Sequence, residues 1–385
     1  MTAAAVPLDA ADALLVGRAW RPDVAGPSVV VVRGGELVDI SAAYPTMRDL
    51  CETADPLAAA AVGGEPVGRL DDILANTPRE TRDPGRPWLL SPVDLQAVKA
   101  VGVTFPVSLL ERVIEERAGG SAERALTIRA DVERLVGTDL AALRPGSPEA
   151  IALKEALIRQ GVWSQYLEVG IGPDSELFTK AQPMSTVGHL AQVGIGAGSS
   201  WNNPEPEIAL VVSAMGRIVG ATLGNDVNLR DVEGRSALLL GRAKDNNASA
   251  SLGPFIRLFD AGFGLDDIRT AEVRLTIEGA DGFRLEGRSD MGRISRDPAD
   301  LVAAAIGPDH GYPDGLVLYL GTMFAPVQDR DATGMGFTHH EGDVVSISSE
   351  RLGALQNTVV PSTQAEPWTF GAAALMRNLA SRGLI

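Results

Sequence analysis

Cysteine, histidine and aromatic residues are scarce in this chain of 385 residues, which has one cysteine, four histidines and 5% aromatics. The single Cys51 excludes a disulfide framework within the chain, and we expect it to be buried as a small apolar residue. No run of 18 apolar residues occurs, so we expect no membrane-spanning helix. Residues 1–5 lack a basic stretch followed by an apolar one, so no signal peptide is expected. These absences predict a soluble cytoplasmic protein.

Positive charge is also in deficit, with 34 lysines and arginines against 50 acidic residues and a net charge of −16. This balance argues against nucleic acid or an anionic membrane as a partner. The apolar content of 45% and the charged content of 22% are those of an ordinary globular protein. An anionic substrate would therefore need locally positive groups in its binding site.

Residues 1–91 are broken by proline and glycine into short segments, and we interpret them as a small N-terminal domain. A Gly34-Gly35 pair between two apolar runs predicts a β-hairpin over residues 29–40. Short helices are expected around residues 46–54 and 69–76.

The next segment, about 92–172, has mainly helical patterns. Ser108 with Glu111 three residues later predicts the start of a helix that ends at Gly119-Gly120. A second helix is expected from Ser121 to about Val136, and a third after Ser147-Pro148. The charged residues of these helices are most simply a solvated face: Glu115, Glu116, Arg117, Glu123 and Arg124.

From Leu177 onward, short β-like runs alternate with glycine, proline and asparagine turns. This pattern favours an α+β protein whose C-terminal part is a mixed β-roll or β-sandwich, rather than alternating βα units. The predicted strands are 208–215, 217–223, 272–278, 315–320 and 344–349.

An acidic cluster opens the first of these strands. Glu205 and Glu207 are two residues apart, so on a strand both side chains emerge on one face. Two such carboxylates repel each other unless a cation neutralises them, and Asp226 can supply a third. An isolated Glu-Pro-Glu is more often a solvated strand end. Two further polar clusters, Asn225–Asp231 and Arg242–Asp245, favour a metal site instead.

Taken together, these motifs resemble the catalytic domain of the fumarylacetoacetate hydrolase superfamily. The resemblance rests on E-x-E before an apolar strand, N-D-x-x-x-R-D, and a lysine before Gly253-Pro254. Leu320-Gly321-Thr322, residues 341–345 and residues 352–357 follow in the family's order. The resemblance implies that residues 92–385 form the catalytic domain, with residues 92–172 as a helical lid or connection.

Three segments resemble the branch of this family that dehydrates 2-keto-3-deoxy sugar acids: 102–105, 175–180 and 336–339. The resemblance implies that Mg²⁺, with Mn²⁺ and Ca²⁺ as alternatives, is held by Glu205, Glu207 and Asp226. It also implies catalytic roles for Glu176 and Lys244, and substrate contacts for the remaining candidates, which are Asn228, Arg230, Thr322 and His339. Two alternatives stay open, because Arg230 with Asp231 is more often an ion pair that holds the turn, and His339 is equally well a structural loop residue.

The expected reaction is dehydration of a 2-keto-3-deoxy-pentonate of the xylonate or arabinonate type to 2,5-dioxopentanoate. The alternative is a hydrolase that cleaves a C–C bond in acylpyruvates or fumarylpyruvate. Hydrolase members use a lid histidine paired with a glutamate, and this chain has no histidine between Ser91 and Glu176. A third hypothesis is a catalytically silent binding protein, which the presence of all the motif residues disfavours. The expected partners are a small anionic keto acid and further copies of the chain, as a homodimer or homotetramer.

Overall fold

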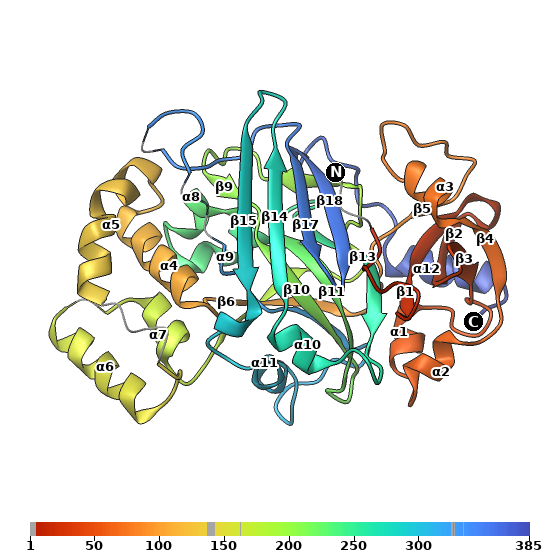
Figure 1. The fold of residues 1–385 in the computed structure, drawn as a ribbon, viewed down its shortest axis with the longest axis horizontal. Helices are drawn as coiled ribbons and strands as arrows, with labels where there is room; N and C mark the ends of the chain where they lie inside the picture. The colour runs from red at the N-terminus through yellow and green to blue at the C-terminus, as the bar shows by residue number, and fades with distance from the viewer. Residues whose placement is uncertain (1–4, 137–142, 162, 325, 327, 334) are drawn as a thin grey trace.

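The computed structural model describes residues 5–136, 143–161, 163–324, 326, 328–333 and 335–385. Two β-sheets are stacked in the middle of the molecule, a group of helices lies at one end, and the N-terminal strands lie at the other (Figure 1). This arrangement confirms the expected α+β class and the β-sandwich in the C-terminal part.

The larger sheet has the strand order β4-β3-β2-β1-β13-β11-β10-β16-β6-β7 in the described residues, and β5 pairs with β1. All neighbours are antiparallel except β16 and β6, which are parallel. The strands are β1 (Leu15–Arg21), β2 (Gly26–Arg33), β3 (Glu36–Asp39), β4 (Glu65–Arg69), β5 (Trp88–Leu89), β6 (Ala97–Gly102), β7 (Glu176–Ala181), β10 (Pro206–Val212), β11 (Ile218–Asp226), β13 (Ala250–Leu258) and β16 (Leu316–Tyr319).

A smaller sheet packs against this one, with the order β15-β14-β17-β18-β8. Its strands are β8 (Gln192–Ile195), β14 (Glu272–Glu278), β15 (Arg284–Asp290), β17 (Val344–Ser349) and β18 (Gly353–Pro361). β9 (Asn202–Asn203) and β12 (Asn228–Leu229) form a separate, short antiparallel pair.

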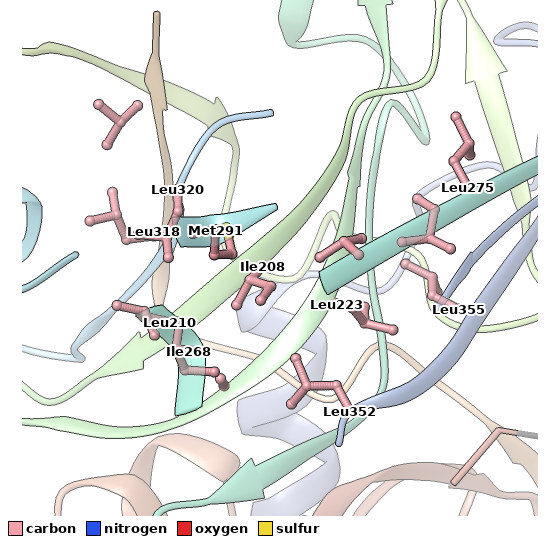
Figure 2. Close-up of a cluster of buried hydrophobic side chains, with 14 of the residues drawn as sticks. Ile208, Leu210, Leu223, Ile268, Leu275, Met291, Leu318, Leu320, Leu352 and Leu355 are labelled. Atoms are coloured by element: carbon pink, nitrogen blue, oxygen red, sulfur yellow. The ribbon is translucent and has the colours of Figure 1, made fainter. Parts of the chain in front are cut away.

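The main core lies between the two sheets. Ile208 and Leu210 of β10 and Leu223 of β11 belong to one buried cluster with Leu275 of β14 and Leu355 of β18 (Figure 2). The alternate residues of β10 are buried on the opposite face, in a second cluster. Burial on both faces explains why this strand is a continuous apolar run in the sequence. A strand held on both sides is a rigid support for the acidic residues at its start.

The helices α4 (Pro106–Ala118), α5 (Ala122–Val136), α6 (Pro148–Arg159) and α7 (Gln165–Ile171) form the group at one end of the sandwich. Of these, α4 packs against α5, α7 and the short helix α8 (Arg230–Glu233). The other helices are α1 (Met47–Cys51), α2 (Pro56–Ala60), α3 (Leu70–Ala75), α9 (Leu240–Lys244), α10 (Leu265–Arg269), α11 (Pro298–Ala305) and α12 (Ala372–Ser381).

Several local predictions are confirmed. Strands β14 and β17 have the bounds that were predicted, 272–278 and 344–349. The N-terminal hairpin turns at Gly34 and Gly35, which both have positive φ. Ser147 caps α6, and Cys51 is buried. Among the described residues, no helix is long and apolar enough to cross a membrane.

Two predictions about the lid segment are wrong. Its first residues are not helical, because 97–102 form β6 inside the larger sheet. The helix predicted to start at Ser108 begins at Pro106, so Ser108 is its third residue. Pro106 is suited to a first helical position because its ring already has a helical φ and it has no N–H to satisfy.

The N-terminal segment is joined to the larger sheet through β1, which pairs with β13 at Leu15 and Val16. The domain boundary near residue 91 stays a prediction. The predicted lid segment also includes residues 137–142 and 162, which lie outside the described residues.

Candidate active site

The three predicted metal ligands are brought together by the pairing of β10 with β11. Glu205 immediately precedes β10, Glu207 lies within it, and Asp226 ends β11. The backbone N–H of Asp226 donates to the carbonyl of Glu205 at 3.0 Å. One carboxylate oxygen from each side chain lies within 4.8 Å of the others, and all three residues are buried. The structure thus assembles the acidic triad that the sequence predicts.

The charges on two of these carboxyl groups are balanced differently. Burial, together with the nearby Asp226 and Glu205, raises the pKa of Glu207 well above its ordinary value. Its Oε2 accepts a hydrogen bond from the backbone N–H of Gly321 at 2.7 Å. Burial alone would raise the pKa of Asp226, but Lys180 and Lys244 hold that pKa below its ordinary value. Of these two carboxyl groups, Glu207 is therefore the one that most needs a further positive charge.

Two buried lysines lie beside the triad. Lys244, at the end of α9, donates to Glu205 Oε2 and also to Asp226 Oδ2 at 3.2 Å. Burial opposes the charge of Lys244, yet Asp226 and Glu205 raise its pKa above the ordinary value. Lys180, in β7, lies 2.8 Å from Asp226 Oδ1 and donates to the carbonyl oxygens of Val227 and Lys244. Lys180 thus ties β7 to the strand that carries Asp226.

An arginine of the lid also reaches the triad, and sequence analysis missed it. Arg112 of α4 donates to Glu205 Oε1 at 2.5 Å and to Glu115 at 2.5 Å. Its Nη1 also lies 3.0 Å from Glu233 Oε2. The only sequence signal is the spacing of Arg112 and Glu115, which are three residues apart and share a helix face. Nothing in the sequence shows that this face turns inward.

The prediction that Glu115 lies on a solvated helical face is wrong. Its exposed fraction is 1%, and it accepts from Arg230 Nε at 2.6 Å. Arg230 also lies 3.2 Å from Glu111, so two acids of α4 neutralise this arginine. Of the other charged residues in that prediction, Glu123 is exposed, as expected. The difference arises because α4 packs against α8 instead of facing solvent.

The expected ion pair between Arg230 and Asp231 is also absent, since Arg230 turns to α4. Asp231 instead accepts hydrogen bonds from Ser199 Oγ at 2.7 Å and from the backbone N–H of Ser200 at 2.9 Å. Asp231 therefore holds the loop before β9, and Arg230 holds α4.

Glu176 lies at the start of β7, opposite Gly102 of β6. Burial is the main cause that raises its pKa to about 7, and the nearby Glu233 raises it further. A carboxyl group with this pKa is present in both protonation states near neutral pH, as a group that accepts and donates protons must be.

These side chains line one pocket between α4, β7 and the start of β10. Five carboxyl groups line it against two cations, Arg112 and Lys244. Thr322 also lines the pocket, and its Oγ1 accepts from the N–H of Phe324 at 3.1 Å. The five acids are Glu176, Glu205, Glu207, Asp226 and Glu233.

Three of the predicted substrate contacts lie apart from this lining, as far as the described residues show. Arg230 is held by α4, and His339 Nδ1 lies 3.1 Å from Asp343, whose other contacts include Arg330. Burial lowers the pKa of His339. Asn228 is buried in β12, and its side-chain amide has no hydrogen-bond partner among the described residues. The substrate roles of these residues stay predictions.

The pocket has the donor set that a hard divalent cation requires. Mg²⁺ and Ca²⁺ bind carboxylate oxygen, and three buried carboxylates converge here. Five acids face three cations, which are Arg112 and Lys244 in the lining and Lys180 beside Asp226. The remaining repulsion is relieved either by protonation, as the raised pKa of Glu207 indicates, or by a bound cation. Glu205, Glu207 and Asp226 are thus the residues that fit a metal ion.

Comparisons with known proteins agree with this geometry. Residues 168–360 match the model of the fumarylacetoacetate (FAA) hydrolase C-terminal family. The chain is 31% identical over 194 residues to a protein of Haloferax volcanii described as a probable 2-keto-3-deoxyxylonate dehydratase. It is 29% identical over 180 residues to a 2-dehydro-3-deoxy-D-arabinonate dehydratase of Saccharolobus solfataricus. These matches cover 50% and 47% of this chain, and 63% and 57% of the two relatives, which is less than two thirds of either.

Solved structures show the same fold over most of the chain. A 2-keto-3-deoxyarabinonate dehydratase superposes with a TM-score of 0.62 at 20% identity, over 90% of this chain and 98% of the other. A 2-keto-3-deoxy-D-arabinonate dehydratase complexed with magnesium and 2,5-dioxopentanoate superposes with a TM-score of 0.60 at 20% identity, over 90% of this chain and 99% of the other. The family model covers half of the chain, and the three acids that it spans are assembled in one buried site. The chain therefore belongs to the fumarylacetoacetate hydrolase family.

Proposed function

We propose that the protein is a metal-dependent hydro-lyase that converts a 2-keto-3-deoxy-pentonate, of the xylonate or arabinonate type, into 2,5-dioxopentanoate. The observation that carries the proposal is the pocket in which Glu176, with a pKa near neutrality, faces the carboxylate triad and Lys244. The names of the two relatives from Haloferax volcanii and Saccharolobus solfataricus support the same substrate class.

The substrate is an anion, and the chain as a whole carries a net charge of −16. Lys244 and Arg112 are the two cations in the lining, so they supply part of the local positive charge that the binding of this anion requires. A divalent cation held by Glu205, Glu207 and Asp226 would act as a Lewis acid on the keto group, and Mg²⁺ is our proposed ion.

Each protein group has a task in the elimination. The C3 proton is the one that leaves, because C3 is the carbon next to the keto group and its protons are therefore acidic. A carboxylate of the pocket accepts this proton. Lys244 stabilises the negative charge that then develops on the C2 oxygen, and this stabilisation acts mainly in the transition state. Glu176 moves protons between C3 and the departing C4 hydroxyl, directly or through a held water molecule. Burial of the site keeps bulk water away from the charged intermediate.

The hydrolase alternative needs a group that activates water for attack on a second carbonyl. In that branch of the family this group is a lid histidine, and the pocket lining has no histidine among the described residues. Glu176 of β7 lines this pocket together with Arg112 of α4 instead. We therefore favour elimination of water over C–C cleavage.

In the decisive experiment, purified protein and Mg²⁺ are incubated with each of the two 2-keto-3-deoxy-pentonates and, separately, with an acylpyruvate. We expect an aldehyde product that an aldehyde dehydrogenase with NAD(P)⁺ oxidises further, and no reaction in excess EDTA. Rapid cleavage of the acylpyruvate, with both keto-deoxy-pentonates intact, would instead establish the hydrolase. Full activity in excess EDTA would refute the metal requirement. The homo-oligomeric state and cytoplasmic location stay predictions.

A further inference from the structure

The guanidinium group of Arg112 is divided between two sets of acids. Its Nη2 donates to Glu205 Oε1 at 2.5 Å, and Glu205 belongs to the carboxylate triad. Its Nη1 donates to Glu115 Oε2 at 2.5 Å and lies 3.0 Å from Glu233 Oε2. Glu115 and Glu233 lie outside the triad, so one end of the arginine holds a triad carboxylate while the other end is anchored elsewhere.

Glu205 is shared between two cations. Arg112 holds its Oε1, and Lys244 holds its Oε2. The side chain of Glu205 is 5% exposed and that of Arg112 is 12% exposed, so water and salt screen this pair only weakly. A metal ion that binds Glu205 would therefore be repelled by both cations at close range. This repulsion falls when one of the two cations turns away from Glu205.

Arg112 is the cation that can turn away. Lys244 donates to two members of the triad, so it remains at the site even when one of these contacts breaks. Arg112 reaches the triad through Nη2 alone, in the contacts of the described residues. Its Nη1 keeps Glu115 and Glu233 as partners, and both of these acids are buried. The buried guanidinium charge thus stays neutralised when Nη2 is released.

Resting on the proposed function, we propose that Arg112 exchanges Glu205 for the anionic substrate when the metal ion binds. The metal ion and Nη2 compete for Glu205, and metal binding releases Nη2. Arg112 lines the same pocket as the triad, so the released Nη2 donates to the carboxylate of the keto acid that enters. Nη1 stays on Glu115, which keeps the arginine at the pocket. Nη2 is therefore available to an anion only after the metal ion is in place.

The exchange couples the affinity for the metal ion to the affinity for the substrate. Removing Arg112 takes away a competitor for Glu205, so Mg²⁺ should bind more tightly. The loaded protein also loses a charge-assisted hydrogen bond to the anion, which should bind more weakly. Loss of positive charge alone would change both affinities in the same directions. A variant that keeps the charge but lacks the two-ended guanidinium group separates the contact from the charge.

The test measures two dissociation constants by calorimetry: that of Mg²⁺, and that of pyruvate on the Mg²⁺-loaded protein. Pyruvate is a 2-oxo acid that has no C4 hydroxyl to eliminate. For Arg112→Met, we expect the Kd of Mg²⁺ to fall by about fivefold or more. The Kd of pyruvate should rise by about tenfold or more. Arg112→Lys should still weaken pyruvate binding, because one ammonium group cannot serve Glu115 and the ligand together.

Arg129→Met is the matched control, because it removes another arginine that pairs with α4. Arg129 Nη2 donates to Glu111 Oε2 at 2.9 Å. Both Kd values of this variant should stay near those of the wild type. The melting temperature of each variant shows whether it is folded.

A crystal structure of the wild type with Mg²⁺ and pyruvate tests the exchange directly and does not depend on any variant. We expect Arg112 Nη2 within hydrogen-bond distance of the pyruvate carboxylate, and Nη1 still on Glu115. The proposal is overturned if Nη2 remains on Glu205 in that structure, or if folded Arg112→Lys binds pyruvate as tightly as the wild type. A wild type that binds no Mg²⁺ would refute the metal site itself, and a wild type that forms no aldehyde would refute the proposed function. Both results are distinct from a failure of the exchange alone.

Discussion

Gly102 lies directly opposite Glu176 in the pairing of β6 with β7, and a methyl group on Gly102 would come within 2.0 Å of Glu176 Oε2. The glycine leaves the space that the carboxyl group of Glu176 occupies. We expect Gly102→Ala to displace that carboxyl group and to lower kcat by up to the factor that loss of an acid–base group causes, about 10²–10⁴-fold.

The fold should survive this change, because the atom that the methyl group meets is the far end of a side chain. Unchanged Mg²⁺ affinity and melting temperature would locate the defect in Glu176. Gly241→Ala, at a glycine with no atom within 4 Å of an added methyl group, is the matched control. Wild-type kcat in Gly102→Ala would show that the position of Glu176 is not critical.

Glu207→Gln should weaken Mg²⁺ binding and should make the metal-free protein more stable. The buried Glu207 is close to Asp226 and Glu205, which raise its pKa well above the ordinary value, so the amide removes a repulsive charge. Titration calorimetry with Mg²⁺ and thermal melting in EDTA measure the two effects. An unchanged Mg²⁺ affinity would exclude Glu207 as a ligand, and Glu286→Gln on the exposed part of β15 is the control.

Lys244→Ala should lower kcat and raise KM, because the positive charge of Lys244 helps to hold an anionic substrate from the start. We expect Lys244 to act by charge, since Asp226 and Glu205 keep its amine protonated. A Schiff base with the keto group is the rival role. Borohydride reduction with substrate present should leave no adduct, and a stable mass increase on Lys244 would overturn the assignment.

The activity should rise as the pH rises through about 7, because Glu176 must be ionised to accept the C3 proton that it then delivers to the C4 hydroxyl. The charged groups that face Glu176 are Arg112, Lys244, Glu205 and Glu233, with Tyr166 of α7 nearby. A metal cation adds positive charge, so the midpoint in the loaded enzyme should lie lower than in the metal-free protein. The kcat profile of the wild type, with Glu176→Gln for comparison, tests this: a fall through pH 7 would mean that Glu176 enters the reaction protonated and is not the base.

Glu176 also makes the stability of the protein depend on pH. Its contribution to stability falls as the pH rises, whereas that of an ordinary salt-bridged acid increases. The pKa of Glu176 is raised in the folded protein, so between about 4.5 and about 7 the folded state binds more protons than the unfolded state. Stability contributed by this group is therefore lost as the pH rises through that window. In EDTA, Glu176→Gln should become more stable relative to the wild type at pH 8 than at pH 5, as measured by urea unfolding.

Arg230→Ala should destabilise the protein by about 3–5 kcal/mol, because it leaves the buried Glu115 and Glu111 without this cation. Urea unfolding measures the loss. Arg284→Ala removes exposed pairs with Glu278 and Glu286 and should have a much smaller effect, because solvent screens exposed pairs. Equal effects in the two variants would mean that the buried ion pairs of Arg230 do not stabilise α4.

The convergence of the three carboxylates could be predicted from sequence because its geometry follows from local rules. Glu205 and Glu207 are two residues apart on a strand, and Asp226 ends the next strand of the same hairpin. The strands β14 and β17 could also be predicted, because apolar and polar residues alternate along them and the apolar ones are buried.

The lid's contribution could not be predicted in this way. Arg112 and Glu115 have the spacing of a solvated helical pair, and only the packing of α4 against α8 shows that they are buried. Glu233 lies three residues after Arg230, so the helix brings both toward α4, but an acid in a short helix has no distinctive sequence signal. Burial of charge depends on tertiary packing, which residue spacing does not reveal.

The pairing of β1 with β13 has a consequence for the chain's association. β13 also pairs with β11, so the N-terminal strands end only two strands away from Asp226. Without residues 1–91, β13 would become an edge strand whose unpaired N–H and C=O groups can pair with another chain. A shortened protein that begins at residue 92 should therefore self-associate through this edge, even though every residue of the carboxylate triad is retained.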